Sequence, residues 1–227
     1  MTDAHCHVSC GDSSVRELLV GRDFFGVHPW ETLEERKVES VKCKVEEELR
    51  PKLLANPKAG VGEIGLDRLK VRDIPPLMRE VFESQLALAL ELRRPVVLHG
   101  AKCWGQVVAA VKRMIGGGLA MGDKRQAFLF HGFSRSDGLI PEIVELNGFI
   151  SVGPAVLNDH AVNYRELVKK IPLDRLLVET DAVAGARVPT RPHIRDVLVK
   201  TADILNLSAA ELEKTTDENA DRFLGAV

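Results

Sequence analysis

The sequence predicts an α/β fold, a single TIM-like (β/α) barrel domain over residues 1–227 that is distorted or shortened near its second strand. Short apolar runs alternate with segments of helical period along the whole chain. These runs are nearly continuous in apolar residues, which is typical of parallel strands that are covered on both faces. No linker, low-complexity tract or internal repeat interrupts the alternation, so one domain is expected.

Seven apolar runs are expected to form the strands: residues 4–8, 24–28, 59–66, 95–99, 127–131, 149–152 and 176–181. The interval between His7 and His28 is too short for a β–α unit of usual length. A short second strand is therefore expected within residues 15–20, with its helix reduced or missing.

Segments of helical period lie between these runs. The expected helices cover residues 34–54, 76–92, 104–115, 141–146, 162–170, 192–205 and 209–224. Pro76 and Pro192 suit the first turn of a helix, and Ser208 with Glu211 resembles a capping box.

Composition limits the classes of protein and partner. A hydrophobic fraction of 45% with 28% charged residues is typical of a soluble globular chain. A formal charge of −2 argues against non-specific binding of duplex DNA through bulk charge. The four cysteines form no C-x-x-C pair, and neither a signal peptide nor a membrane-length apolar run is present. A cytoplasmic protein with reduced thiols and no membrane association is expected.

The pair His5-x-His7 is the first sign of chemistry. Residues i and i+2 of a strand face the same side, so both imidazoles can bind one ion while Cys6 faces away. Carboxylates and imidazoles also stand at or near the ends of later strand runs, where the side chains of a barrel converge. These further candidates are Glu63, His99, His131 and Asp181. Such ligands suit zinc, manganese, iron or nickel, and a carboxylate can bridge two ions.

A purely structural role is the alternative for each of these residues. His99 alone would more often be a hydrogen-bonded core group than a ligand. Two imidazoles on one face of a buried strand need a common reason, however, and Glu63 and Asp181 would be unpaired charges without a cation or donor. A centre for two divalent ions therefore explains the set better.

The chain resembles the TatD family of metal-dependent deoxyribonucleases, a branch related to the amidohydrolase superfamily. The resemblance covers nearly the whole chain and rests on an ordered set of short motifs. They are Asp3-Ala4-His5-Cys6-His7, Gly26-Val27-His28-Pro29, Gly62-Glu63-Ile64-Gly65-Leu66-Asp67, Phe82-x-x-Gln85-Leu86-Ala87-Leu88-Ala89, Pro95-Val96-Val97-Leu98-His99, His131-Gly132-Phe133-Ser134, Leu177-Val178-Glu179-Thr180-Asp181 and Asn219-x-x-Arg222-Phe223.

This resemblance implies a barrel-shaped hydrolase with two divalent metal ions per chain, zinc, magnesium or manganese. One ion would be bound by His5, His7, Glu63 and Asp181, and the other by Glu63, His99 and His131, with Glu63 as the bridge. The implied activity is cleavage of DNA phosphodiesters, commonly as a 3′→5′ exonuclease or at damaged sites. The implied partner is therefore DNA, with single-stranded ends as the expected substrate, and no obligate protein partner is inferred.

The chain departs from the family pattern at several positions. It has Arg135 where the family often has glycine, and Ala101 followed by Lys102 where an arginine often follows the histidine. After Asp181 the usual Ala-Pro becomes Ala182-Val183. The metal ligands are kept, so these departures concern the choice of substrate. The short N-terminal part and the corner at His28-Pro29-Trp30 are similar to a short bacterial branch of the family.

The expected chemistry is attack of a metal-activated hydroxide on phosphorus, with Asp181 and Glu63 as the catalytic residues. Asp181 would take the proton of the water. His28 is expected to contact the scissile phosphate, or to make a helix-entry hydrogen bond beside Pro29. Lys102 and Arg135 would contact the nucleic-acid backbone, or remain solvated surface charges.

More distant cations and two tryptophans are weaker candidates. Arg187, Arg191 and Arg195 are interpreted as a basic rim or as surface charges. Trp30 and Trp104 can stack on bases, although packing in the core or at the rim is favoured.

Two other functions are compatible with this set of residues. An amidohydrolase would use the same ligands on a small ester, lactone, amide or phosphoester. No lysine stands in the bridging position, where Glu63 is found, and this favours the nuclease. A catalytically silent metal-binding barrel with a protein partner is the second alternative; the presence of all six ligands argues against it.

Overall fold

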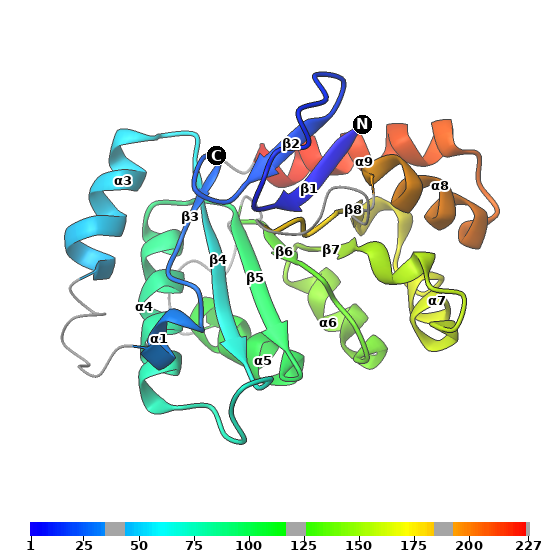
Figure 1. Cartoon of the computed structure of the whole chain (residues 1–227). Helices are drawn as coiled ribbons and strands as arrows, with labels where there is room; N and C mark the ends of the chain where they lie inside the picture. The colour runs from blue at the N-terminus through cyan, green and yellow to red at the C-terminus, as the bar shows by residue number, and fades with distance from the viewer. Residues whose placement is uncertain (35–43, 117–125, 184–192, 226–227) are drawn as a thin grey trace.

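The computed structural model describes residues 1–34, 44–116, 126–183 and 193–225 (Figure 1). The strands are β1 (Thr2–Cys6), β2 (Arg16–Leu19), β3 (Phe24–Phe25), β4 (Gly60–Asp67), β5 (Val96–Ala101), β6 (Phe128–Phe130), β7 (Gly148–Val152) and β8 (Leu176–Val178). All of their pairings are parallel. Each strand predicted from an apolar run is present, with shifted ends, and the short second strand is β2.

The strands form one two-stranded sheet, β1–β2, and one six-stranded sheet, β3 to β8 in chain order. A single bridge between Val20 and Phe24 connects β2 to β3. On the other side, Asp181 N donates to His5 O at 3.0 Å and His7 N donates to Ala182 O at 2.8 Å. These links connect the two sheets on both sides. The predicted fold class is confirmed, and the irregular part lies among β1, β2 and β3, as predicted.

The helices alternate with the strands. They are α1 (Glu31–Glu34), the π-helix η1 (Lys44–Leu49), α3 (Arg50–Ala55), α4 (Pro76–Glu91), α5 (Trp104–Gly116), α6 (Ile140–Glu145), α7 (Val162–Val168), α8 (Ile194–Leu205) and α9 (Ala209–Leu224). Short 3₁₀-helices are η2 (Asp137–Leu139), η3 (Pro154–Leu157) and η4 (Leu173–Arg175).

The helix predicted over residues 34–54 needs correction. Residues 35–43 of it lie outside the described part of the chain, and η1 runs into α3 in the remainder. Pro51 has no N–H, so it cannot make the hydrogen bond that would continue an α-helix from the preceding turn. The wider π turn of η1 directly precedes this position.

Two helix starts that the sequence predicted are confirmed. Pro76 occupies the first turn of α4. Ser208 caps α9 by accepting from Glu211 N, and the Glu211 side chain accepts from Ser208 N at 2.9 Å. Pro192, expected at the start of α8, lies outside the described residues.

The last helix, α9, packs against the first and last strands, β1 and β8 (Figure 1). Asn219 Nδ2 donates to the carbonyls of Leu173 and Leu176 at 2.7 Å each. Phe223 is fully buried and stacks on Phe24, with ring centroids 5.9 Å apart. The Asn219-x-x-Arg222-Phe223 motif thus fixes the start of β8 to this helix.

Two further observations concern the described residues. Cys6, Cys10 and Cys103 are not in disulfide bonds, and Cys43 is not described. None of the described helices has the length and apolar character needed to span a membrane.

Candidate metal centre

The structure brings the six predicted ligands together at the end of the barrel where the strands finish. His5 and His99 lie within β1 and β5, and Glu63 lies in the middle of β4. His7 and His131 directly follow β1 and β6, and Asp181 stands three residues beyond the end of β8. Because the carboxyl ends of parallel strands share one end of a barrel, side chains far apart in sequence meet there.

Glu63 stands at the centre of the cluster and is 4% exposed. Its Oε2 atom lies 3.5 Å from His5 Nε2 and 3.5 Å from His7 Nε2. Asp181 Oδ1 closes this group at 3.7 Å from His5 Nε2 and 3.5 Å from His7 Nε2. His5 and His7 therefore lie between one carboxylate oxygen of Glu63 and one of Asp181.

The other oxygen of Glu63 faces a second group. Oε1 lies 2.5 Å from His99 Nδ1 and 2.5 Å from His131 Nε2, and these two ring nitrogens are 3.2 Å apart. His28 Nε2 completes the group at 3.7 Å from the same oxygen. Each carboxylate oxygen of Glu63 thus serves a different set of imidazoles, which is the arrangement of a bridging ligand.

The donors of the first group suit a cation. His5 is fully buried, yet neither of its ring nitrogens has a hydrogen-bond partner among the residues that the structure describes. Ligands about 2.0–2.2 Å from a tetrahedral zinc ion stand roughly 3.3–3.6 Å apart. The separations of 3.5–3.7 Å around His5 and His7 are within about 0.1 Å of that spacing and are too long for good hydrogen bonds. The residues present therefore fit a divalent metal ion.

A second carboxylate, Asp67, orients His99. Asp67 is 1% exposed, and its Oδ2 accepts from His99 Nε2 at 2.8 Å. The same oxygen accepts from Trp30 Nε1 at 2.9 Å. Since His99 Nε2 donates to Asp67, His99 Nδ1 is left as the atom that faces Glu63. A ligand histidine that donates its other N–H to a carboxylate is a common feature of metal sites.

Glu179 stands in a similar place behind His131. Its Oε1 accepts from Gly132 N at 2.7 Å and lies 3.7 Å from His131 Nδ1, and its Oε2 accepts from Ser151 Oγ at 2.6 Å. Neither Glu179 nor Asp67 was among the site residues predicted from the sequence. Their spacing from the ligands could have indicated these roles. Glu179 lies two residues before Asp181, and Asp67 lies four residues after Glu63; an even spacing places two side chains on the same face of a strand.

The charges of the cluster shift the pKa values of its members in opposite directions. Burial acts to raise the pKa of Glu63, but the neighbouring His131 and the other imidazoles hold it well below its usual value. Burial lowers the pKa of His131, but the Glu63 carboxylate outweighs it and raises that pKa well above its ordinary value. The neighbouring carboxylates of Asp181 and Glu63 raise the pKa of His7 to about 9. Because the pKa values of His7 and His131 are raised, a cation bound to these rings would displace protons from them.

His28 lies beside the second group and is 24% exposed. Its Nδ1 accepts from Trp30 N at 3.1 Å, which is the helix-entry hydrogen bond considered from the sequence. The neutral ring therefore carries its proton on Nε2, the atom that points toward Glu63. The two roles expected for His28 are compatible, because Nδ1 accepts the backbone hydrogen bond while Nε2 faces the cluster.

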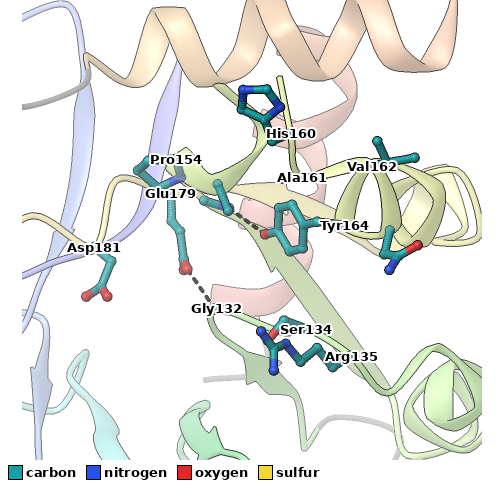
Figure 2. A pocket seen from close by; sticks show the side chains of 13 residues that line it. Gly132, Ser134, Arg135, Pro154, His160, Ala161, Val162, Tyr164, Glu179 and Asp181 are labelled. Carbon is teal, nitrogen blue, oxygen red and sulfur yellow. Dashed lines mark hydrogen bonds between the residues drawn. The ribbon is translucent and has the colours of Figure 1, made fainter. Parts of the chain in front are cut away.

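A cleft with two lobes opens above the cluster. The first lobe has a volume of about 760 Å³ and extends toward η3 and α7. The second has a volume of about 600 Å³ and extends toward the β5–α5 loop. Figure 2 shows Glu179 and Asp181 on one side of the first lobe, with Tyr164 and Arg135 on the other. Arg135 and Asp181 line both lobes.

The cations proposed from the sequence fall into three groups. Arg135 and Lys102 are exposed and line the cleft. Arg195 is exposed in the first turn of α8 and does not line either lobe. Arg187 and Arg191 lie outside the described residues. Of the tryptophans, Trp30 is 37% exposed, whereas Trp104 is 4% exposed and packs between Phe130 and Phe133.

The chain is similar to known proteins. The profile of the family described as TatD related DNase matches residues 21–225. A Bacillus subtilis protein named "Uncharacterized metal-dependent hydrolase YabD" is 31% identical over 169 residues, which cover 72% of this chain and 64% of that protein. A Klebsiella pneumoniae protein named "3'-5' ssDNA/RNA exonuclease TatD" is 33% identical over 176 residues, covering 73% of this chain and 64% of that protein. The chain thus spans less than two-thirds of the length of these relatives.

A solved structure shows the same fold. The crystal structure of YjjV, a TatD homolog from Escherichia coli K12, superposes with a TM-score of 0.71 at 27% identity. The superposition covers 94% of this chain and 78% of the YjjV chain.

Proposed function

This chain belongs to the TatD-related DNase family, and from that premise we propose that it hydrolyses phosphodiester bonds of DNA from a single-stranded end with two divalent metal ions. The proposal rests on the position of the Glu63 carboxylate, whose two oxygens face different groups of imidazoles. One oxygen lies 3.5 Å from His5 and His7, and the other lies 2.5 Å from His99 and His131. A relative named as a 3′-5′ exonuclease on single-stranded DNA and RNA supports the choice of substrate.

The proposed ligands are divided between two ions. His5, His7 and Asp181 would hold the first ion, His99 and His131 the second, and Glu63 both. Zinc, manganese or magnesium bound there would lower the pKa of a water molecule and stabilise charge on the phosphate oxygens.

Asp181 is the proposed proton acceptor. Burial acts to raise its pKa, but the imidazoles of His7, His131 and His5 together outweigh burial and lower the pKa, so the group is a carboxylate at neutral pH. Its side chain is 45% exposed and lines both lobes of the cleft, where a substrate and a water molecule can meet it. In the reaction, a water oxygen bonds to phosphorus, and the bond from phosphorus to the 3′-oxygen of the shortened strand breaks. One proton of the water passes to Asp181, and the leaving oxygen takes up a proton from solvent.

Three groups are proposed to contact the phosphate. His28 presents its Nε2 proton beside Glu63, because Nδ1 is already engaged with Trp30 N. Lys102 and Arg135 stand on the wall of the cleft. These contacts would orient the phosphodiester without taking part in bond breaking.

The test compares the full chain with Asp181→Asn and a matched control, Asp203→Asn, on the exposed side of α8. Bound metals are measured first. End-labelled single-stranded DNA, an abasic duplex, a small phosphodiester and a carboxylic ester are then assayed with magnesium, manganese and zinc. A ladder of products from the 3′ end is expected, with kcat lowered by about 10²–10⁴-fold in Asp181→Asn and unchanged in the control.

Three results would contradict the proposal. Turnover of the carboxylic ester alone would select the amidohydrolase. Protein that binds no metal and cleaves none of these substrates would select the catalytically silent barrel. Full activity of Asp181→Asn would exclude this residue as the proton acceptor.

A further inference from the structure

The cleft above the metal cluster is divided, and its two lobes are of similar size. Both volumes, about 760 Å³ and about 600 Å³, fall within the range of roughly 300–1,000 Å³ that is usual for small-molecule sites. Four residues line both lobes: Gly132, Ser134, Arg135 and Asp181. His99 and His131 line the second lobe, so the cluster lies where the lobes join.

Each lobe has an apolar wall. The first lobe is bounded by Pro154, Ala155, Val162 and the ring of Tyr164 (Figure 2). Tyr164 is fixed in place, because its hydroxyl oxygen accepts from Gly153 N at 3.1 Å. Apolar walls with few polar groups suit flat rings better than a charged backbone.

The second lobe is similar in character. Leu69, Ala101 and Cys103 line it, and Trp104 contributes the small part of its side chain that is not buried in the core. Both lobes therefore offer an apolar surface to a base or sugar.

Positive charge is concentrated where the lobes meet. Among the described lysine and arginine residues, only Arg135 lines both lobes, and Lys102 lines the second. Arg135 is exposed and makes no hydrogen bond or ion pair with another described residue, so its guanidinium is available for a bidentate contact with phosphate. The described walls hold no row of cations that could follow a longer strand.

From the two lobes and their single shared cation, we propose that the cleft accepts a dinucleotide unit, with one nucleoside in each lobe and the phosphate between them against Arg135 and the metal cluster. This inference rests on the proposed function and adds a substrate class to it: the last two nucleotides of a chain, or a free dinucleotide. Nucleotides further along the chain would lie outside the cleft and add little to binding.

The test is a length series of 5′-phosphorylated oligothymidylates, from dinucleotide to twentymer, with the manganese-loaded full chain. The dinucleotide is expected to be cleaved with a kcat/KM within about threefold of that of the longest substrate, because few phosphates are neutralised beyond the cleft. Arg135→Ala should raise KM by roughly ten- to a hundredfold at every length, as expected for loss of hydrogen bonds to a charged group. Arg113→Ala, at the far end of α5, is the matched control and should leave KM unchanged.

A binding measurement separates the cleft from catalysis. Asp181→Asn is titrated with a fluorescent dinucleotide and a fluorescent twentymer at several salt concentrations. A log–log slope of roughly −0.7 to −1.4 is expected for both, corresponding to one or two neutralised phosphates. Ala155→Trp should fill the first lobe and weaken this binding, while manganese binding measured by calorimetry stays unchanged.

The results of these experiments distinguish the dinucleotide cleft from the proposed nuclease function. Rapid cleavage of the twentymer with an inert dinucleotide, or a slope near −4 for the twentymer (roughly six phosphates), would overturn the dinucleotide cleft and leave the nuclease intact. An unchanged KM in Arg135→Ala would also overturn the cleft. Failure to cleave any length would overturn the proposed function and the inference with it.

Discussion

Replacing Asp67 with asparagine tests whether a carboxylate behind His99 controls metal binding. In the folded protein, Asp67 Oδ2 accepts from His99 Nε2 at 2.8 Å and from Trp30 Nε1 at 2.9 Å, and Oδ1 accepts from Leu69 N at 2.5 Å. An asparagine that keeps the bond from Leu69 N must present its NH₂ group to His99. The ring would then lose its donor contact or move its proton to Nδ1, the atom that faces Glu63.

Either result weakens metal binding beside Glu63 Oε1. Loss of a carboxylate that orients a ligand histidine typically lowers metal affinity 10–100-fold, which corresponds to about 1.4–2.8 kcal/mol. The affinity is measured by competition with a chromophoric chelator, and folding by circular dichroism in urea. The barrel should remain folded, since Asp67→Asn preserves the volume of the side chain.

Trp30→Phe is the matched control for this substitution. It removes the hydrogen bond from Trp30 Nε1 to Asp67 but leaves the bond from His99 intact, so a smaller loss of affinity is expected. If Asp67→Asn binds metal as tightly as the unchanged protein, Asp67 does not orient a ligand. If Trp30→Phe has the larger effect, the tryptophan contact and not the histidine contact is responsible.

Three other perturbations follow from the structure. In the presence of a chelator, Asp181 and Glu63 raise the pKa of His7 to about 9. The contribution of this group to the free energy of unfolding is fully present below about pH 6.5 and is lost as the pH rises toward 9. Urea denaturation of His7→Gln should therefore show a smaller decline in the free energy of unfolding over that range. Zinc at about a hundred times its Kd should raise the free energy of unfolding by about 2.7 kcal/mol, and Glu63→Ala should abolish the gain in thermal melts. Phe223→Ala should cost about 3–5 kcal/mol in urea denaturation, because the ring is fully buried against Phe24; a loss below 1 kcal/mol would contradict this packing.

The strands could be predicted because their apolar runs are nearly continuous, but their ends depend on partners that a single run does not reveal. The run at 176–181 illustrates this. Glu179 N still donates to Val152 O in β7, whereas Thr180 N donates to the carboxylate of Asp3, and Asp181 N donates to His5 O. The chain thus changes partners from β7 to β1, and β8 ends at Val178.

The candidate ligands could be predicted because imidazole and carboxylate groups are conspicuous in apolar strands. The roles of Asp67 and Glu179 could not, because they depend on contacts across strands. Asp67 pairs in register with Ala101, yet its carboxylate reaches back to His99. The lobes of the cleft were also beyond prediction, since they are formed by loops after different strands.

The hydrogen bonds that join the first and last strands involve residues of the cluster itself. His7 N donates to Ala182 O and Asp181 N donates to His5 O, and the side chains of these three cluster residues form one group of candidate metal ligands. A cation bound there would act as a cross-link between the two ends of the strand order, so local opening and ion release become a single event. Deuterium uptake at the amides of His7 and Asp181 should therefore slow on metal loading, while the amides of the β5–β6 ladder keep their rates.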